Sequence, residues 1–225
     1  METPTNMYEG LNKSLYSDNT RIQIESSSRC NLSCPGCSRT KWLASGKAGD
    51  IRDMEMSHFH ALMRPENGIK RLTYNMALSD PIFSGSFMQQ MEYMDTLEHR
   101  PEVTISTNGS GRKQAWWLRF AGLLRDRDVV EFAIDGLEDT NHLYRINSDW
   151  DSIMLGVKTL RANWKGRMGW RYVVFEHNYH QLVEAKELAR ELGFKRFRPI
   201  LGDARTPEHM LLKSKTWAEL ENDLS

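Results

Sequence analysis

Strand-like and helix-like segments alternate along most of this 225-residue chain, and this alternation constrains the fold more than any other feature. Between the candidate strands, apolar residues recur at the spacing of amphipathic helices. Strands that alternate with helices form parallel sheets through right-handed crossovers. The pattern therefore predicts an α/β fold, either a partial (β/α)6 barrel of the TIM type, which we favour, or an open sheet. The candidate strands are 21–25, 69–76, 103–106, 129–134, 170–175 and 194–200.

Several local features of this pattern make definite structural predictions. Residues 38–53 are rich in Lys, Arg, Gly and Asp and are predicted to form a loop. Ser86 with Gln89 has the spacing of a capping box, and Asn178 is predicted to cap another helix. The nearly continuous apolar run Tyr172–Phe175 is typical of a strand covered on both faces.

Polar or thiol side chains follow each of the five best-defined strands. In parallel α/β folds the site lies at the carboxyl ends of the strands, so we expect these groups to meet at one mouth. The rule brings cysteines, carboxylates and an amide together. The segments concerned are Ser26–Cys37, Leu78–Asp80, Thr107–Asn108, Asp135 and Glu176–His177.

Each polar candidate also has a purely structural interpretation. Asp80 precedes a proline and Asn108 precedes a glycine, and both pairs are common in turns. The structural alternative for Asp135 is that its side chain caps the loop that follows it. His177 is equally compatible with an exposed loop histidine, and Arg145 with a solvated charge. The sequence leaves these alternatives open.

Cys30, Cys34 and Cys37 are the only cysteines in the chain and have the spacing C-x3-C-x2-C. Thiolates this close can converge on one metal centre, whereas a disulfide would leave the third unpaired. Three thiolates on an iron–sulfur cubane would leave one iron without a protein ligand. The alternative is a structural zinc held by the three cysteines and one of the seven histidines. A position at the mouth of a barrel favours the cluster.

The composition excludes several other classes of protein. Lys+Arg and Asp+Glu both number 30, so the basic excess of a general nucleic-acid binder is absent. No apolar run approaches the roughly 18 residues of a membrane span. The first residues lack the basic and apolar regions of a signal peptide. We therefore expect a cytoplasmic protein, where clustered cysteines are typical of metal or catalytic sites.

The cysteine motif resembles that of the radical S-adenosylmethionine (radical SAM) enzymes, and the resemblance covers roughly residues 20–200. Cys30, Cys34 and Cys37 match the family motif position by position. Thr107–Gly109 is similar to a frequent family stretch after the third strand. Ala133–Gly136 followed by Arg145 resembles peptide-modifying members that carry SPASM or twitch extensions.

The resemblance implies a chemistry and a set of site residues. The three cysteines would hold a [4Fe-4S] cluster whose open iron binds S-adenosylmethionine. An electron from the cluster, supplied by a donor such as flavodoxin or ferredoxin, would cleave the sulfonium to a 5′-deoxyadenosyl radical that abstracts hydrogen from a substrate. The implied cofactor-binding residues are Ser79, Asp80, Ser106, Asn108 and Asp135. The candidate substrate-binding residues are Arg145, Glu176 and His177.

The chain departs from the family pattern at three points. Leu78–Pro81 stands where the family usually has Gly-Gly-Glu-Pro, and Gly36 stands where an aromatic residue is frequent. The chain also lacks the further cysteines that hold auxiliary clusters in the extended members. It therefore resembles a minimal core.

We expect an enzyme of this class, acting first on a peptide or protein side chain. The alternatives are a nucleoside or small-metabolite substrate, as in modified-base biosynthesis, and a non-catalytic zinc or iron–sulfur module. The expected organisation is an N-terminal arm at 1–19, a radical SAM partial-barrel domain at 20–203 and a C-terminal tail or helix at 204–225.

Overall fold

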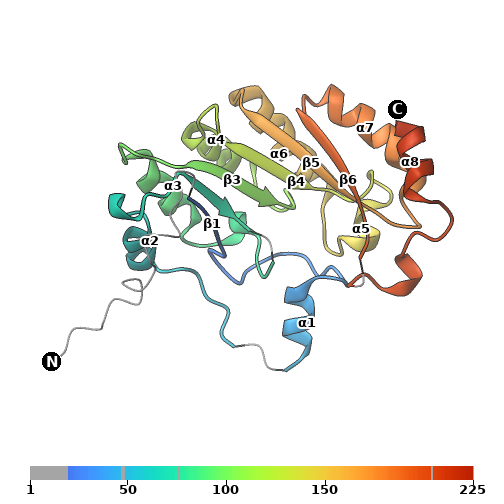
Figure 1. Cartoon of the computed structure of the whole chain (residues 1–225), viewed down its shortest axis with the longest axis horizontal. Helices are drawn as coiled ribbons and strands as arrows, with labels where there is room; N and C mark the ends of the chain where they lie inside the picture. The colour runs from blue at the N-terminus through green and yellow to red at the C-terminus, as the bar shows by residue number, and fades with distance from the viewer. Residues whose placement is uncertain (1–19, 47–48, 76, 204, 225) are drawn as a thin grey trace.

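The computed structural model describes residues 20–46, 49–75, 77–203 and 205–224, so the predicted arm at 1–19 lies outside the described residues. Its centre is one six-stranded sheet in which the strands follow one another in chain order (Figure 1). Every neighbouring pair is parallel, which confirms the predicted parallel α/β fold. The strands are β1 (Arg21–Ile24), β2 (Arg71–Tyr74), β3 (Glu102–Thr107), β4 (Val129–Ala133), β5 (Arg167–Val174) and β6 (Arg196–Leu201).

Helices connect the strands, and the larger ones cover one face of the sheet (Figure 1). The α-helices are α1 (Ser38–Ala44), α2 (Met56–Leu62), α3 (Phe87–Asp95), α4 (Gln114–Leu123), α5 (Asn141–Tyr144), α6 (Trp150–Asn163), α7 (Leu182–Glu191) and α8 (Trp217–Leu224). The 3-10 turns are η2 (Pro65–Asn67), η3 (Pro81–Phe83), η4 (Tyr179–Gln181) and η5 (Glu208–Met210). Of these helices, none is long and apolar enough to cross a bilayer.

The hydrophobic core lies between the helices and the covered face of the sheet. Alternate strand residues such as Tyr74, Phe132 and Trp170 are almost completely buried there, as the two-residue period of a strand requires. Helices α4 and α6 approach closely, because Gly156 leaves room for the Trp117 ring. A Cβ atom on Gly156 would lie 2.5 Å from that ring. The methionines of α3 are buried in this core, so they serve packing.

The opposite face of the sheet is less covered than the face that packs against the helices. Gln23 is exposed, and Thr73, Thr104, Glu131 and Arg171 are only half-buried on their strands. The predicted cover on both faces is largely confirmed at 172–175, where only Val173 is half-buried, but it does not extend along the whole sheet. The physical reason is that polar and charged side chains occupy the alternate positions, and these remain hydrated on the open face.

The prediction of a loop at 38–53 is wrong for the first of these residues, because α1 forms directly after Cys37. The helix is docked by Arg39, which is buried and whose Nε donates to the Ser28 carbonyl at 2.8 Å. The charged composition concealed this contact, since a long arginine side chain can bury its stem and still satisfy its charge.

The predicted capping box of α3 does not form. Ser86 is the N-cap residue, but its side chain makes no capping hydrogen bond. Instead, its hydroxyl donates to the Met54 carbonyl at 2.9 Å and accepts from Gln90 Nε2 at 3.0 Å. The side chain is used for tertiary contacts, which single-helix spacing rules cannot anticipate.

Asn178 likewise does not cap a helix with its side chain. Its Oδ1 accepts from the Phe175 N–H at 2.7 Å, and its Nδ2 donates to the carbonyls of Asp135 and Val173. It therefore joins the carboxyl ends of β4 and β5. The predicted final helix is confirmed as α8, which buries Leu220.

Candidate functional site

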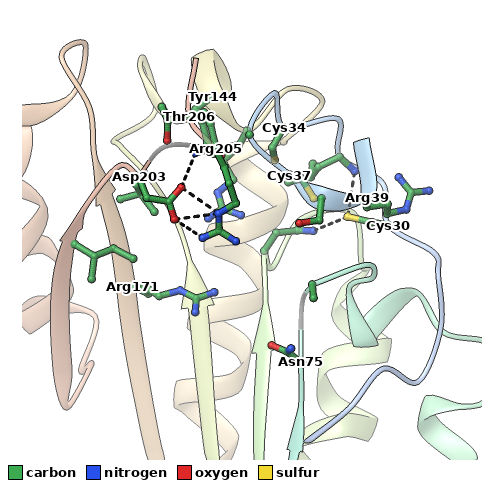
Figure 2. Close-up of a pocket in the computed structure, with 18 of the residues that line it drawn as sticks. Cys30, Cys34, Cys37, Arg39, Asn75, Tyr144, Arg171, Asp203, Arg205 and Thr206 are labelled. Carbon is green, nitrogen blue, oxygen red and sulfur yellow. Dashed lines mark hydrogen bonds and ion pairs between the residues drawn. The ribbon is translucent and has the colours of Figure 1, made fainter. Parts of the chain in front are cut away.

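A cavity of about 350 Å³ opens at the carboxyl ends of the strands, where parallel α/β folds have their sites (Figure 2). Its wall combines the loop after β1, the ends of β2, β3, β5 and β6, and helix α5. The lining residues include all three cysteines. The other polar side chains that line it are Ser38, Arg39, Asn75, Ser79, Asn108, Tyr144, Arg145, Arg171, Asp203, Arg205 and Thr206.

The three cysteines are free thiols on this wall. Cys30 Sγ accepts from the Leu32 N–H at 3.4 Å and from Asn108 Nδ2 at 3.7 Å. The Cys37 N–H donates to the Cys34 carbonyl at 3.1 Å, and this turn leads into α1. Burial raises the pKa of Cys30 to about 12 and that of Cys34 to about 11. The Cys30 and Cys34 thiols therefore hold their protons until a metal displaces them.

The donor set on this wall is three thiols without a histidine among the described residues. In the described part of the chain, no group of three or more His, Cys, Asp or Glu side chains is placed to hold a single metal ion. In a [4Fe-4S] cubane each thiolate binds a different iron, so the three sulfurs lie farther apart than ligands of a single metal ion. The residues present fit a three-cysteine [4Fe-4S] cluster with an open iron, and they do not complete a four-ligand zinc site.

Arg145 lies on the cavity wall and is held by an ion pair with Asp135. Arg145 Nε donates to Asp135 Oδ2 at 2.7 Å, and the Asp135 side chain is fully buried. Burial alone would lower the pKa of Arg145, but the charge of Asp135 and its hydrogen bond to the guanidinium raise it. Asp135 also accepts from the Val173 N–H at 2.7 Å. It therefore stands behind the wall as a support for Arg145.

Asp80 is also fully buried and stands behind the wall. It accepts from the Asn108 N–H at 2.7 Å and from the Ile82 N–H at 3.2 Å, so it joins the loops after β2 and β3. Burial raises the pKa of its carboxyl to about 6, although these hydrogen bonds oppose the shift. Asn108 itself reaches the cavity and donates to Asn31 Oδ1 at 3.0 Å.

Ser79 lines the cavity and is held by Glu25, a residue that the sequence analysis did not single out. Its hydroxyl donates to Glu25 Oε2 at 2.8 Å, and the other Glu25 oxygen accepts from the Ala77 N–H. Glu25 directly follows β1, so the same carboxyl-end rule could have identified it. Ser106 is buried near the end of β3 and is not among the lining residues.

Glu176 and His177 lie apart from the lining of this cavity. Glu176 Oε2 accepts from the backbone N–H groups of Lys213 and Ser214 and so fastens the C-terminal segment. The His177 ring stacks on Phe175 at 5.3 Å between centroids. The structure thus gathers the cysteines, Ser79, Asn108 and Arg145, but not these two residues.

Several lining residues were missed by the sequence analysis. Tyr144 lies over Gly36, where an added Cβ would be 2.5 Å from the phenol oxygen. The phenol oxygen of Tyr144, from α5, thus occupies the space that a side chain at position 36 would need. Arg171 comes from the middle of β5, whereas Asp203 and Arg205 follow the carboxyl end of β6 as an ion pair (Figure 2).

Comparisons with known proteins agree on the fold. No protein-family model matches the sequence, and no protein of curated function matches it. Among solved structures, Streptococcus suis SuiB bound to S-adenosylmethionine matches with a TM-score of 0.69 and 16% identity, over 91% of this chain and 45% of SuiB. A histidine-tagged anSMEcpe with bound AdoMet matches with a TM-score of 0.70 and 16% identity, over 91% of this chain and 56% of anSMEcpe.

A third match is TsrM from Kitasatospora setae, a radical S-adenosylmethionine methyltransferase with cobalamin and a [4Fe-4S] cluster bound. Its TM-score is 0.56 at 11% identity, over 80% of this chain and 36% of TsrM. The chain has the radical SAM fold. It spans about half the length of SuiB and anSMEcpe, and its six parallel strands correspond to the partial barrel of that fold.

Proposed function

We propose that this protein is a radical SAM enzyme that cleaves S-adenosylmethionine reductively and starts hydrogen abstraction from a substrate. One observation carries the proposal, namely that Cys30, Cys34 and Cys37 line a single cavity at the carboxyl ends of a parallel sheet. The fold shared with structures that bind S-adenosylmethionine supports it. When bound, a [4Fe-4S] cluster would supply the electron for the cleavage.

In this proposal the protein's own residues hold and orient the reactants. The three thiols are the cluster ligands, and Asn108 restrains Cys30 by donating to its sulfur. Ser79, Asn108 and Arg145 face the cavity and offer polar contacts to adenosylmethionine. Asp80 and Asp135 act behind them, since each holds a cavity-lining segment through buried hydrogen bonds. Ser106, Glu176 and His177 have no contact role in this arrangement.

For the substrate, we propose a peptide or protein side chain. SuiB was solved with the precursor peptide SuiA, and anSMEcpe was solved with the Cp18Cys peptide. The open polar face of the sheet in this chain would leave room for such a segment beside the cavity. A flavodoxin or ferredoxin remains the proposed electron donor.

The test is anaerobic reconstitution of the full chain with iron and sulfide, followed by addition of dithionite and adenosylmethionine. We expect about four irons per chain and dithionite-dependent release of 5′-deoxyadenosine. Cys34→Ala should abolish the release, whereas the exposed neighbour change Ser33→Ala should leave it unaltered. One tightly bound zinc without cleavage, or full activity of Cys34→Ala, would refute the proposal.

A further inference from the structure

Two arginines lie side by side on the open face of the sheet without a partner for their charge. Arg171 on β5 and Arg198 on β6 are paired in the strand register. Within the described ranges, neither guanidinium makes a hydrogen bond or an ion pair, and Arg198 Nε is buried without a partner. Arg171 lines the cavity that contains the cysteines, and Figure 2 shows it below Asp203 and Arg205.

The other arginines of the cavity wall do have partners. Arg145 pairs with Asp135, Arg205 pairs with Asp203, and Arg39 donates to a backbone carbonyl. Carboxylates compensate the charges of Arg145 and Arg205, whereas Arg171 on the wall and Arg198 beside it in the register add positive charge that no ion pair compensates within the described residues. Unpaired charge in a partly buried place is costly unless a ligand compensates it.

The electrostatics around Arg171 support this assignment. Burial, followed by repulsion from Arg145 and Arg198, lowers the pKa of Arg171. The acidic groups that face it, Glu131 and Asp135, offset only part of the effect. Glu131 forms no ion pair with Arg171 within the described residues. The local field therefore favours a bound anion.

We propose that Arg171 and Arg198 bind an oxyanion group, a phosphate or a carboxylate, carried by the substrate of this cavity. The assignment to a substrate rests on the function proposed above. Neighbouring strands are about 4.8 Å apart, so two guanidiniums in register can converge on one anion. Each guanidinium presents its donors as a planar fork that matches the oxygens of a phosphate or carboxylate.

The test measures anion binding directly, by calorimetric titration of the full chain with inorganic phosphate and with succinate. Arg171→Gln and Arg198→Gln should each weaken binding about tenfold or more, as expected for loss of a charged hydrogen bond. Arg196→Gln is the matched control, because Arg196 lies two residues away on the same strand and is exposed. It should leave the affinity within about twofold, since an exposed charge is largely screened.

The outcomes separate this inference from the proposed function. Tighter phosphate binding would indicate a phosphorylated substrate, and tighter succinate binding a carboxylate. Absence of binding, or equal weakening by all three variants, would overturn the inference. A parallel loss of adenosylmethionine affinity in Arg171→Gln would also overturn it, by assigning the pair to the cofactor. Anion binding that persists in a chain unable to cleave adenosylmethionine would contradict only the proposed function.

If Arg171→Gln does not fold, as judged by circular dichroism, Arg171→Lys replaces it. Lysine keeps the charge but lacks the planar fork, so the same weakening of anion binding is expected from lost geometry. Unchanged affinity in both Arg171→Lys and Arg198→Gln would overturn the inference.

Discussion

At the scale of single residues, the site depends on how side chains from distant segments share space. Gly36 lies between two candidate cluster ligands, and Tyr144 from α5 fills the volume above it. Tyr144 in turn packs against Phe175, with the ring centroids 4.3 Å apart. The cysteine loop is therefore shaped partly by α5 and by the residue that follows β5, more than a hundred positions further along the chain.

The close approach of Gly36 and Tyr144 predicts that substitutions at these two positions have coupled effects on stability. Gly36→Ala should lower the free energy of unfolding by about 1–3 kcal/mol, because overpacking forces neighbours to move. The added Cβ would lie 2.5 Å from the Tyr144 oxygen and 3.1 Å from the Arg205 carbonyl oxygen. Tyr144→Phe removes the nearer atom, so the double variant should recover part of the loss in urea denaturation.

Gly122→Ala provides the control, because Gly122 lies in α4 with no heavy atom within 4 Å of the added Cβ. It should be neutral or stabilising, by up to about 1 kcal/mol. A Gly36→Ala protein as stable as the unmodified one would show that the loop adapts freely.

At the scale of elements, a second buried ion pair holds the amino ends of the strands together. Asp128 accepts from Arg100 Nη1 and Nη2 at 3.0 and 2.7 Å, and neither side chain is exposed. It also accepts from the N–H groups of Val103 and Arg125. One carboxylate thus joins the loops that enter β3 and β4, at the end of the sheet opposite the cavity.

Asp128→Asn should therefore destabilise the fold without altering the site. Removing one partner of a buried pair costs about 3–5 kcal/mol, since the other charge stays buried. Asp95→Asn is the matched change, because its pair with Arg125 is exposed and such pairs contribute about 0–1 kcal/mol. Thermal unfolding should separate the two variants, while adenosylmethionine binding per folded molecule stays the same in both. Loss of binding by folded Asp128→Asn would contradict this division of roles.

At the scale of the whole molecule, buried titratable groups make the stability depend on pH. His177 Nε2 is buried with no partner among the described residues, and burial lowers the pKa of this imidazole. The folded protein therefore binds this proton less readily than the unfolded chain does. The stabilisation is complete above the unfolded pKa of about 6.5 and is lost as the pH falls below it.

His177→Gln should accordingly reduce the decline in unfolding free energy between pH 7.5 and pH 5.5. Asp80 also titrates in this range, because its pKa is raised to about 6, and it makes the fold more stable as the pH falls. This effect is the same in the variant and in the unmodified protein, so the difference between their pH profiles reports His177 alone. Urea denaturation at each pH provides the measurement, and the exposed His58→Gln is the control. Identical pH profiles for His177→Gln and unmodified protein would disprove the effect.

The sequence by itself determined the parallel α/β fold, because hydrophobic periodicity and chain order are local properties that specify strands, helices and their direction of pairing. It also determined that the cysteine loop, Ser79 and Asn108 would meet, because every parallel strand ends at the same edge, although the same rule also placed Glu176 and His177 there, and these two do not line the cavity. Only the tertiary structure decided which polar groups face the cavity and which stand behind it, as with Asp80 and Asp135.

The tertiary structure also decided what covers the sheet and what shapes the cavity. The docking of Arg39, the ring of Tyr144 above Gly36 and the unpartnered pair Arg171 and Arg198 all depend on side chains from distant segments. Such contacts leave no periodic trace in the sequence, because their energy comes from neighbours brought together only by folding.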